Sequence, residues 1–283
     1  MKIISDIEEM IELARQWRAA GESVGLVPTM GYLHAGHLSL IRQARADTGH
    51  VVVSIFVNPT QFGPNEDFLR YPRDLDEDKA LCEQAGVDVV FTPRAAEMYP
   101  ENYDIYVEAA DLSRRLCGRS RPGHFRGVCT VVLKLWHIVQ PHHAYFGQKD
   151  AQQFLILERM ARDLNIAGLV LHQMPIIREA DGLALSSRNV YLSAEERRQA
   201  PVLRRALLAA ERLYAAGERQ AAALLDAMRQ ELAQADLAMV DYLEIVDTVY
   251  LKPVAEIKGQ ALVALAVYFG RTRLIDNILL GEK

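Results

Sequence analysis

Short apolar segments that alternate with helix-like segments are the feature that most restricts how this chain can fold. The segment VVVSIFV (51–57) is apolar at every position except Ser54 and rich in β-branched residues, which is typical of a strand buried on both faces. Further strand candidates lie at 24–27, 87–93, 143–147 and 168–174, and helix candidates at 36–47, 74–86, 128–140 and 151–165. This alternation predicts an α/β fold, a Rossmann-like doubly wound parallel sheet, over residues 1–175.

The sequence changes character after about residue 175. Residues 193–234 are rich in Ala, Leu, Arg and Glu and read as amphipathic helices separated near Gly217. Three strand candidates follow, at 241–247, 261–269 and 273–280. We therefore expect residues 176–283 to form a smaller α+β domain, which would act as a lid.

At the other end of the chain, Ser5 and Glu8 have the spacing of a helix-capping box.

Composition excludes several classes of function. Of the 283 residues, 50% are apolar and 24% charged, and the formal net charge of −5 argues against binding to nucleic acid or to a membrane surface. The three cysteines show no CxxC spacing, which fits a reducing compartment better than a disulfide framework. No apolar run approaches the ~20 residues that span a bilayer. We expect a cytoplasmic protein.

The stretch PTMGYLHAGH (28–37) directly follows a predicted strand. Gly31 would permit an unusual turn, and Gly36 would let a ligand approach the first turn of a helix, where amide groups favour anions. His34 and His37 are three residues apart, so both imidazoles would project to the same side and could donate to phosphate oxygens. Taken alone, HxxH is also compatible with a solvated turn, or with a metal site that lacks a nearby third ligand.

Polar side chains follow the next buried strand as well. In FVNPTQF (56–62), Asn58 and Gln61 offer neutral amides that can bind a hydroxyl or a carboxylate without adding charge. The charged run 66–78 reads as a solvated helix face. Farther along, GRSRPGHFRGV (118–128) combines three arginines with three glycines, which suits a mobile basic lid over an anionic substrate.

Two further stretches provide cations. In FGQKDAQQ (146–153), Lys149 could neutralise a phosphate, and Asp150 could cap a helix or bind a metal ion or ribose hydroxyl, with Gln153 on the same helical face. In LSSRNVYLS (185–193), two serines precede Arg188, which could grip phosphate oxygens with its guanidinium fork. The chain has no Walker A, GxGxxG or GxSxG motif, so catalysis by positioning and charge stabilisation fits best.

These five stretches, in this order and at these spacings, resemble the bacterial pantothenate synthetase family over essentially the whole chain. HAGH by itself is similar to the HxGH signature of the wider adenylyl-transferring superfamily. The resemblance implies an ATP-dependent ligation of (R)-pantoate with β-alanine through pantoyl adenylate, with release of AMP and Mg-pyrophosphate. It also implies a homodimer.

The resemblance implies roles for individual residues too. His37 would be a proton donor or an electrostatic stabiliser, and His34, Lys149 and Arg188 would assist at the phosphates. Gln61 and Gln153 would bind pantoate with Asn58 close by, and Gln61 would adjoin β-alanine. The ATP site would comprise Met30, Gly31, Tyr32, Leu33, His34, Ala35, Gly36, His37, Gly147, Gln148, Lys149, Asp150, Ile177, Leu185, Ser186, Ser187 and Arg188.

Two other interpretations stay open at this point. A nucleotidylyl transferase of the same fold would need no amine site and would leave FVNPTQF without a role. A non-catalytic nucleotide-binding regulator could keep the glycines, but it would not need the two histidines, Lys149 and Arg188 together.

Overall fold

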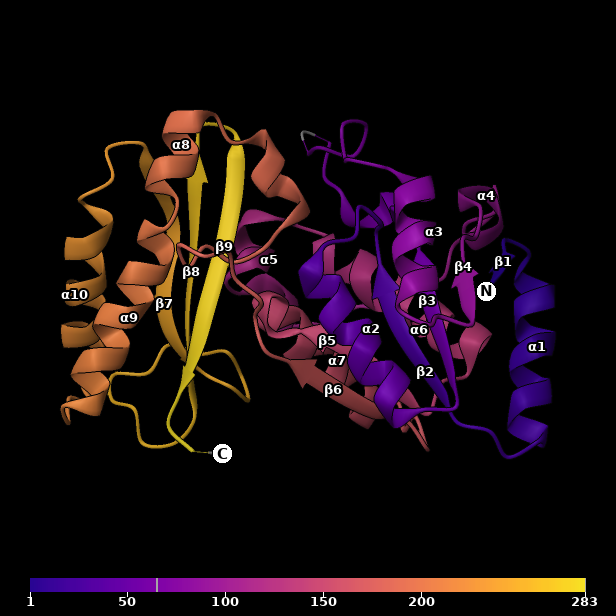
Figure 1. Ribbon diagram of the computed structural model, residues 1–283. Coiled ribbons are helices and arrows are strands. Elements are labelled where there is room, and N and C mark those ends of the chain that lie inside the picture. The colour runs from indigo at the N-terminus through magenta and orange to yellow at the C-terminus, as the bar shows by residue number, and fades with distance from the viewer. Residues whose placement is uncertain (65, 283) are drawn as a thin grey trace.

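Two separate sheets organise the molecule. The computed structural model describes residues 1–64 and 66–282. Six strands form a parallel sheet in the order β1-β4-β3-β2-β5-β6, and three form an antiparallel sheet, β7-β8-β9. The bounds of the first sheet are β1 Lys2–Ile4, β2 Val24–Thr29, β3 His50–Ile55, β4 Val89–Phe91, β5 His143–Gly147 and β6 Val170–Met174. The two sheets occupy opposite sides of the view in Figure 1. The predicted fold class is confirmed.

Helices cover both faces of the parallel sheet. On one face pack α1 Ile7–Ala19, α6 His124–Val139 and α7 Ala151–Asp163, and on the other α2 Ala35–Asp47 and α3 Leu75–Gln84. Strand β3 shows why its sequence is apolar throughout: Val52 joins the first cluster, whereas Val51 and Val53 join the second. Alternate residues of a strand face opposite sides, so a sheet covered on both sides requires apolar residues throughout.

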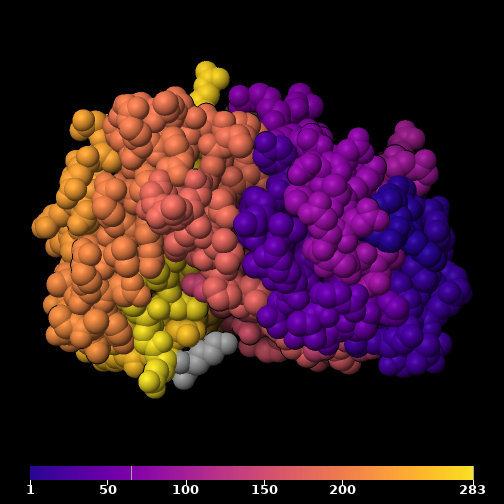
Figure 2. Space-filling view, in the orientation of Figure 1, coloured from indigo at the N-terminus to yellow at the C-terminus, as the bar shows by residue number. Residues whose placement is uncertain are grey.

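The antiparallel sheet packs against the core of the parallel-sheet part of the molecule. Its strands are β7 Ala238–Asp247, β8 Ala261–Phe269 and β9 Thr272–Leu280, and it carries α9 Val202–Ala215 and α10 Ala221–Leu232. In β8, Val263 and Leu265 pack with these helices, whereas Leu262 and Ala264 pack with the core of the parallel-sheet part. In Figure 2 the part of the chain that carries the second sheet, orange to yellow, lies directly against the part that carries the parallel sheet.

Local predictions hold with some corrections. The break near Gly217 is confirmed, because α9 ends before it and α10 begins after it. The capping box is wrong by one residue: Asp6 caps α1 by accepting from the amide of Glu9 at 2.9 Å, and the Ser5 hydroxyl bonds to Thr92. Strand β1 and the short α4 Ala95–Met98 were not predicted, and neither was the break that separates α8 Ala194–Gln199 from α9 within the run that was expected to be helical.

Residues 118–128 were expected to form a mobile basic lid, and the structure places most of them in helices. Residues 118–120 belong to the short helix α5 Cys117–Ser120 and residues 124–128 to the first turns of α6, and Phe125 and Gly127 are buried. A Cβ at Gly127 would lie 2.5 Å from the carbonyl carbon of Thr60, so this glycine allows α6 to pack closely against the segment that follows β3. The stretch is therefore a packed part of the fold.

Candidate active site

The strand order places the predicted motifs at one location. Successive connections run outward from β2 through β3 and β4 in one direction, and from β5 to β6 in the other, so the order reverses between the neighbours β2 and β5. Ligands bind beyond the carboxyl ends of strands at such a switch point. Strand β2 leads into residues 30–37, and β5 leads into residues 147–150. Both stretches therefore lie where the fold favours a ligand.

The turn after β2 has an unusual backbone. Gly31 and Tyr32 both have positive φ angles, 79° and 52°. The turn ends at His34, the N-cap of α2, whose Nδ1 accepts the amide of Gly36 at 3.1 Å. The Nδ1 atom of His37 accepts the amide of His34 at 3.3 Å, and the centroids of the two rings are 4.1 Å apart. Gly31 thus has the role that was predicted for it.

The hydrogen bonds of the two histidines fix their tautomers. Because each Nδ1 accepts an amide hydrogen, the proton of the neutral ring is on Nε2, which can donate to a ligand. Burial and the charge of Lys149 lower the pKa of His34 to about 4. Burial, followed by the neighbours His34 and Lys149, lowers the pKa of His37 well below its usual value. Both rings are therefore neutral near pH 7 and act as hydrogen-bond donors through Nε2.

The role predicted for Gly36 needs correction. A Cβ at this position would lie 2.8 Å from Cε1 of the His34 ring, so the glycine makes room for that imidazole. Its amide is also used by His34, and the amide of His34 is used by His37. The amides of His34 and Gly36, which were expected to face an anion, are therefore hydrogen-bonded to the two imidazoles.

The second motif follows β5. Residues Gln148–Asp150 form a short 3₁₀ turn, and Asn277 of β9 donates to the carbonyl oxygens of Gln148 and Lys149 at 2.9 and 3.0 Å. The second sheet therefore fixes the backbone that carries Lys149. Among the described residues, the Asp150 side chain makes no capping hydrogen bond to α7. Its Oδ2 lies 3.7 Å from Nζ of Lys149.

Of the two amide side chains that follow β3, that of Asn58 is buried and that of Gln61 is half-buried. Asn58 is buried: its Oδ1 accepts from the hydroxyls of Tyr99 and Thr60, and its Nδ2 donates to Gly127 and to Oε1 of Gln61 at 3.1 Å. Gln61 ends the 3₁₀ turn Pro59–Gln61, and its Nε2 lies 3.2 Å from Sδ of Met30. Asn58 therefore positions Gln61.

The stretch 185–188 contacts the turn that follows β2. Ser187 donates to the carbonyl oxygen of Tyr32 at 3.4 Å, and Ser186 accepts the amide of Arg188 at 3.3 Å. The amide of Leu185 donates to the carbonyl oxygen of Ile177 at 3.0 Å, so these two predicted nucleotide-site residues lie together.

A cavity of about 900 Å³ lies between the two sheets. Lys149, Asp150, Gln153, Ser186 and Arg188 line it. Other predicted site residues are not among the described residues that line it, including His34, His37, Gln61 and Ile177. The turn that carries the two histidines is linked to the cavity wall, because the hydroxyl of Ser187, between the lining residues Ser186 and Arg188, donates to the carbonyl oxygen of Tyr32.

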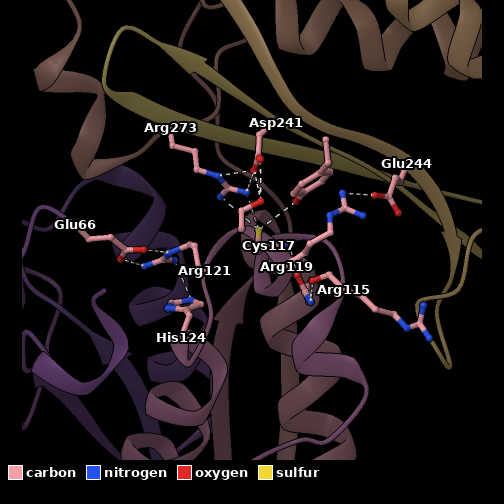
Figure 3. A network of polar contacts seen from close by, with 12 residues as sticks. Glu66, Arg115, Cys117, Arg119, Arg121, His124, Asp241, Glu244 and Arg273 are labelled. Carbon is pink, nitrogen blue, oxygen red and sulfur yellow. Dashed lines mark hydrogen bonds and ion pairs between the residues drawn. The ribbon is translucent and has the colours of Figure 1, made fainter. Parts of the chain in front are cut away.

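Sequence reasoning missed the carboxylates that hold the cations of this cavity. Asp67 accepts from Nε and Nη2 of Arg188, both at 2.9 Å, and Glu66 accepts from Nε and Nη2 of Arg121 at 2.7 and 2.6 Å. Figure 3 shows Arg121 between Glu66 and His124. Both acids come from the run 66–78 that was interpreted as a solvated helix face, and nothing in that local pattern distinguished them.

Asp78 is the other residue that was missed. Its side chain is buried, and it accepts the amides of Tyr32 and Leu33 at 2.9 and 2.7 Å. It belongs to the same charged run, so no local pattern distinguished it from its exposed neighbours.

Neither a membrane-spanning helix nor a cluster of three potential metal ligands occurs in the part of the chain that the structure describes. Within residues 1–64 and 66–282, no helix is long and apolar enough to cross a bilayer. The same residues contain no group of three histidine, cysteine or carboxylate side chains that could hold a metal ion.

Comparisons with known proteins agree with the geometry. The family described as Pantoate-beta-alanine ligase matches residues 2–279. The pantothenate synthetase of Thermotoga neapolitana is 57% identical over 99% of this chain and 100% of its own length, and that of Acetivibrio thermocellus is 53% identical over 99% of both.

Solved structures give the same result. A pantothenate synthetase from Thermus thermophilus superimposes with a TM-score of 0.92 at 48% identity, over 98% of this chain and 99% of the other. A Francisella tularensis pantoate-beta-alanine ligase, solved with β-γ ATP and β-alanine, gives 0.79 at 33% identity, over 99% and 97%. The chain belongs to the pantoate–β-alanine ligase family.

Proposed function

We propose that this site joins (R)-pantoate to β-alanine at the expense of ATP, in two steps. The pantoate carboxylate attacks the α-phosphorus of ATP, which forms pantoyl adenylate and releases pyrophosphate. The amine of β-alanine then attacks the acyl carbon and expels AMP, and the product is pantothenate, a precursor of coenzyme A. The nucleophiles belong to the substrates, so the protein contributes position and charge.

The observation that carries this proposal is the meeting of three motifs at the switch point. Residues 30–37, 147–150 and 185–188, together with Ile177, would surround ATP. Lys149, whose backbone is held by Asn277, supplies a positive charge that lowers the pKa of both imidazoles. A polyphosphate would be met by a cation and by two Nε2–H donors, the groups that stabilise charge as pyrophosphate departs.

We assign His37 an electrostatic role. Its ring is neutral near pH 7, because burial and the nearby charge hold its pKa low, so it would donate a hydrogen bond to the departing phosphate. His34 would act in the same way. For His37→Gln we expect a lower rate whose pH dependence keeps the wild-type shape. Loss of one acidic or basic limb of the pH–rate profile would assign proton transfer to His37 instead.

Gln61 and Gln153 are the proposed contacts for pantoate, and Gln61 would also adjoin β-alanine. Gln153 lines the cavity, whereas Gln61 is held at its place by Asn58. We assign Asn58 the role of a positioning residue, because its own amide is occupied within the protein.

The site fits a magnesium ion that arrives with the nucleotide. Mg²⁺ commonly keeps several waters and uses only one or two carboxylates beside substrate phosphates. Asp150, half-buried and without a capping bond among the described residues, would provide that carboxylate beside Lys149. The bound ion would neutralise phosphate charge and make pyrophosphate a better leaving group.

Three further assignments complete the proposal. We divide the chain into a nucleotide- and pantoate-binding domain, residues 1–175, and a lid domain, residues 176–283. We also propose that the protein is a cytoplasmic homodimer.

The proposal is tested by incubating the protein with ATP, Mg²⁺ and pantoate. Pyrophosphate release that needs pantoate, followed by AMP release that needs β-alanine, is the expected result. A transferase that stops at a nucleotide product would give no AMP on addition of β-alanine. A regulator would bind ATP and release no pyrophosphate.

A further inference from the structure

The turn that leads into HAGH combines a strained backbone with a dense set of side-chain acceptors. Gly31 tolerates its φ of 79°, but Tyr32, at 52°, lies in the left-handed region, where a residue with a Cβ is strained. A strained turn of this kind persists only where other contacts determine its shape.

Asp78 provides those contacts. Its two carboxylate oxygens each accept one of two successive amides, Tyr32 at Oδ2 and Leu33 at Oδ1. The neighbouring amides are also satisfied by side chains: that of Gly31 by the hydroxyl of Thr29, and that of His34 by the ring of His37. Asp78 is the only one of these acceptors that comes from a distant part of the sequence, helix α3.

The location of Asp78 carries an energetic cost. The residue is 2% exposed, and burial raises the pKa of its carboxyl in spite of the two amide donors. A buried carboxylate is retained where its hydrogen bonds offset desolvation. Any side chain at Gly31 would intrude on this contact, because a Cβ there would lie 2.8 Å from Oδ2 of Asp78.

We infer that Asp78 is a positioning residue for the first half-reaction: it clamps the 31–33 turn and so sets where His34 and His37 meet the phosphates of ATP. The inference rests on the proposed role of the two histidines. It differs from a purely structural role, because displacement of the turn should slow adenylate formation selectively. The second half-reaction, which starts from preformed pantoyl adenylate, should be much less affected.

The test compares Asp78→Asn with the control Asp76→Asn. Asp76 is on the same helix, and its side chain is 96% exposed. In Asp78→Asn the amide nitrogen faces one of the two backbone donors, so one hydrogen bond is lost. A displacement near 1 Å at reacting groups can cost ~10²-fold. We expect pantoate-dependent pyrophosphate release to fall ~10–100-fold, the second half-reaction to change less than ~3-fold, and Asp76→Asn to match wild type.

Amide hydrogen exchange gives a readout that does not depend on activity. In the ligand-free protein, exchange at Tyr32 and Leu33 should accelerate in Asp78→Asn and stay unchanged in Asp76→Asn. Equal losses in both half-reactions, or unchanged exchange at the two amides, would overturn the inference.

A second variant covers the case in which Asp78→Asn does not fold. Gly31→Ala strains the same turn, because its Cβ would press on Oδ2 of Asp78 and alanine disfavours a φ of 79°, and it should slow the first half-reaction selectively as well. Equal slowing of both half-reactions in folded Gly31→Ala contradicts the inference. If wild-type protein releases no pyrophosphate with ATP and pantoate, the proposed function has failed, whereas the exchange measurement still decides whether Asp78 holds the turn.

Discussion

Gly127 controls how closely helix α6 approaches the segment that carries Gln61. A Cβ added at Gly127 would lie 2.5 Å from the carbonyl carbon of Thr60 and 2.6 Å from the amide nitrogen of Gln61. Ordinary contact begins near 3.4 Å, so in Gly127→Ala the 59–61 turn or the helix must move by about 1 Å. Both contacts are backbone atoms, which cannot rotate away as a side chain could.

Two effects of Gly127→Ala oppose each other. Alanine is favoured over glycine within a helix by about 1 kcal/mol. Overpacking a closely packed site costs about 1–3 kcal/mol. A 1 Å displacement of backbone belongs at the upper end of that range, so the clash prevails. We expect a net loss of about 1–2 kcal/mol, seen as a melting temperature lower by a few degrees.

The same displacement moves Gln61, a proposed pantoate contact. We expect kcat/KM for pantoate to fall ~10–100-fold, with a much smaller change in KM for ATP. Steady-state kinetics and thermal unfolding measure both effects. Gly259→Ala is the matched control, because a Cβ there would meet no described atom within 4 Å. A Gly127→Ala protein that melts at or above the wild-type temperature and keeps its pantoate kinetics would refute the reasoning.

Three other predictions concern charges. Asp67→Asn should lower the KM for ATP several-fold, because it removes the carboxylate charge and frees one of the two Arg188 donors that Asp67 occupies. Asp276→Asn should lower the free energy of unfolding by about 3–5 kcal/mol in a denaturant titration, because it leaves the largely buried Arg178 without its bidentate partner. Burial lowers the pKa of His124 to about 3, so the unfolded chain binds a proton that the folded one does not; melting temperature should fall as pH drops below ~6.5, and less steeply in His124→Gln.

Each of these predictions has its own contrary result. A higher KM for ATP in Asp67→Asn would mean that this carboxylate orients Arg188, and Asp76→Asn controls for the loss of a charge. An Asp276→Asn protein as stable as wild type would show that the pair adds nothing. An identical pH slope in His124→Gln would place the acid sensitivity at other groups.

Much of the fold could be predicted because its signals are local. Strand β3 and helix α7 are recognisable from apolar patterns that follow from covering a sheet on both faces and a helix on one. Helix boundaries were less well predicted. Asp6 and Ser5 are both good capping residues, and only the pairing of Ser5 with Thr92, far along the chain, assigns the cap to Asp6.

The motifs of the site were also found from sequence, but not the relations among them. Asn58 and Gln61 were assigned the same kind of role, although only the packing of α6 and Tyr99 against Asn58 buries that amide. Arg188, predicted to grip phosphate, lines the cavity, whereas its pairing with Asp67 joins residues 121 positions apart.

The sequence by itself determined the parallel sheet, the second α+β region and the placement of HAGH and QKD at strand ends, because strand and helix periodicity is set over a few residues. Tertiary structure alone decided which charges are free, which amides are occupied and that Asp78 lies under the turn before His34. Burial and pairing depend on contacts between distant segments. A carboxylate in an acidic run has the same local pattern whether water or two backbone amides surround it.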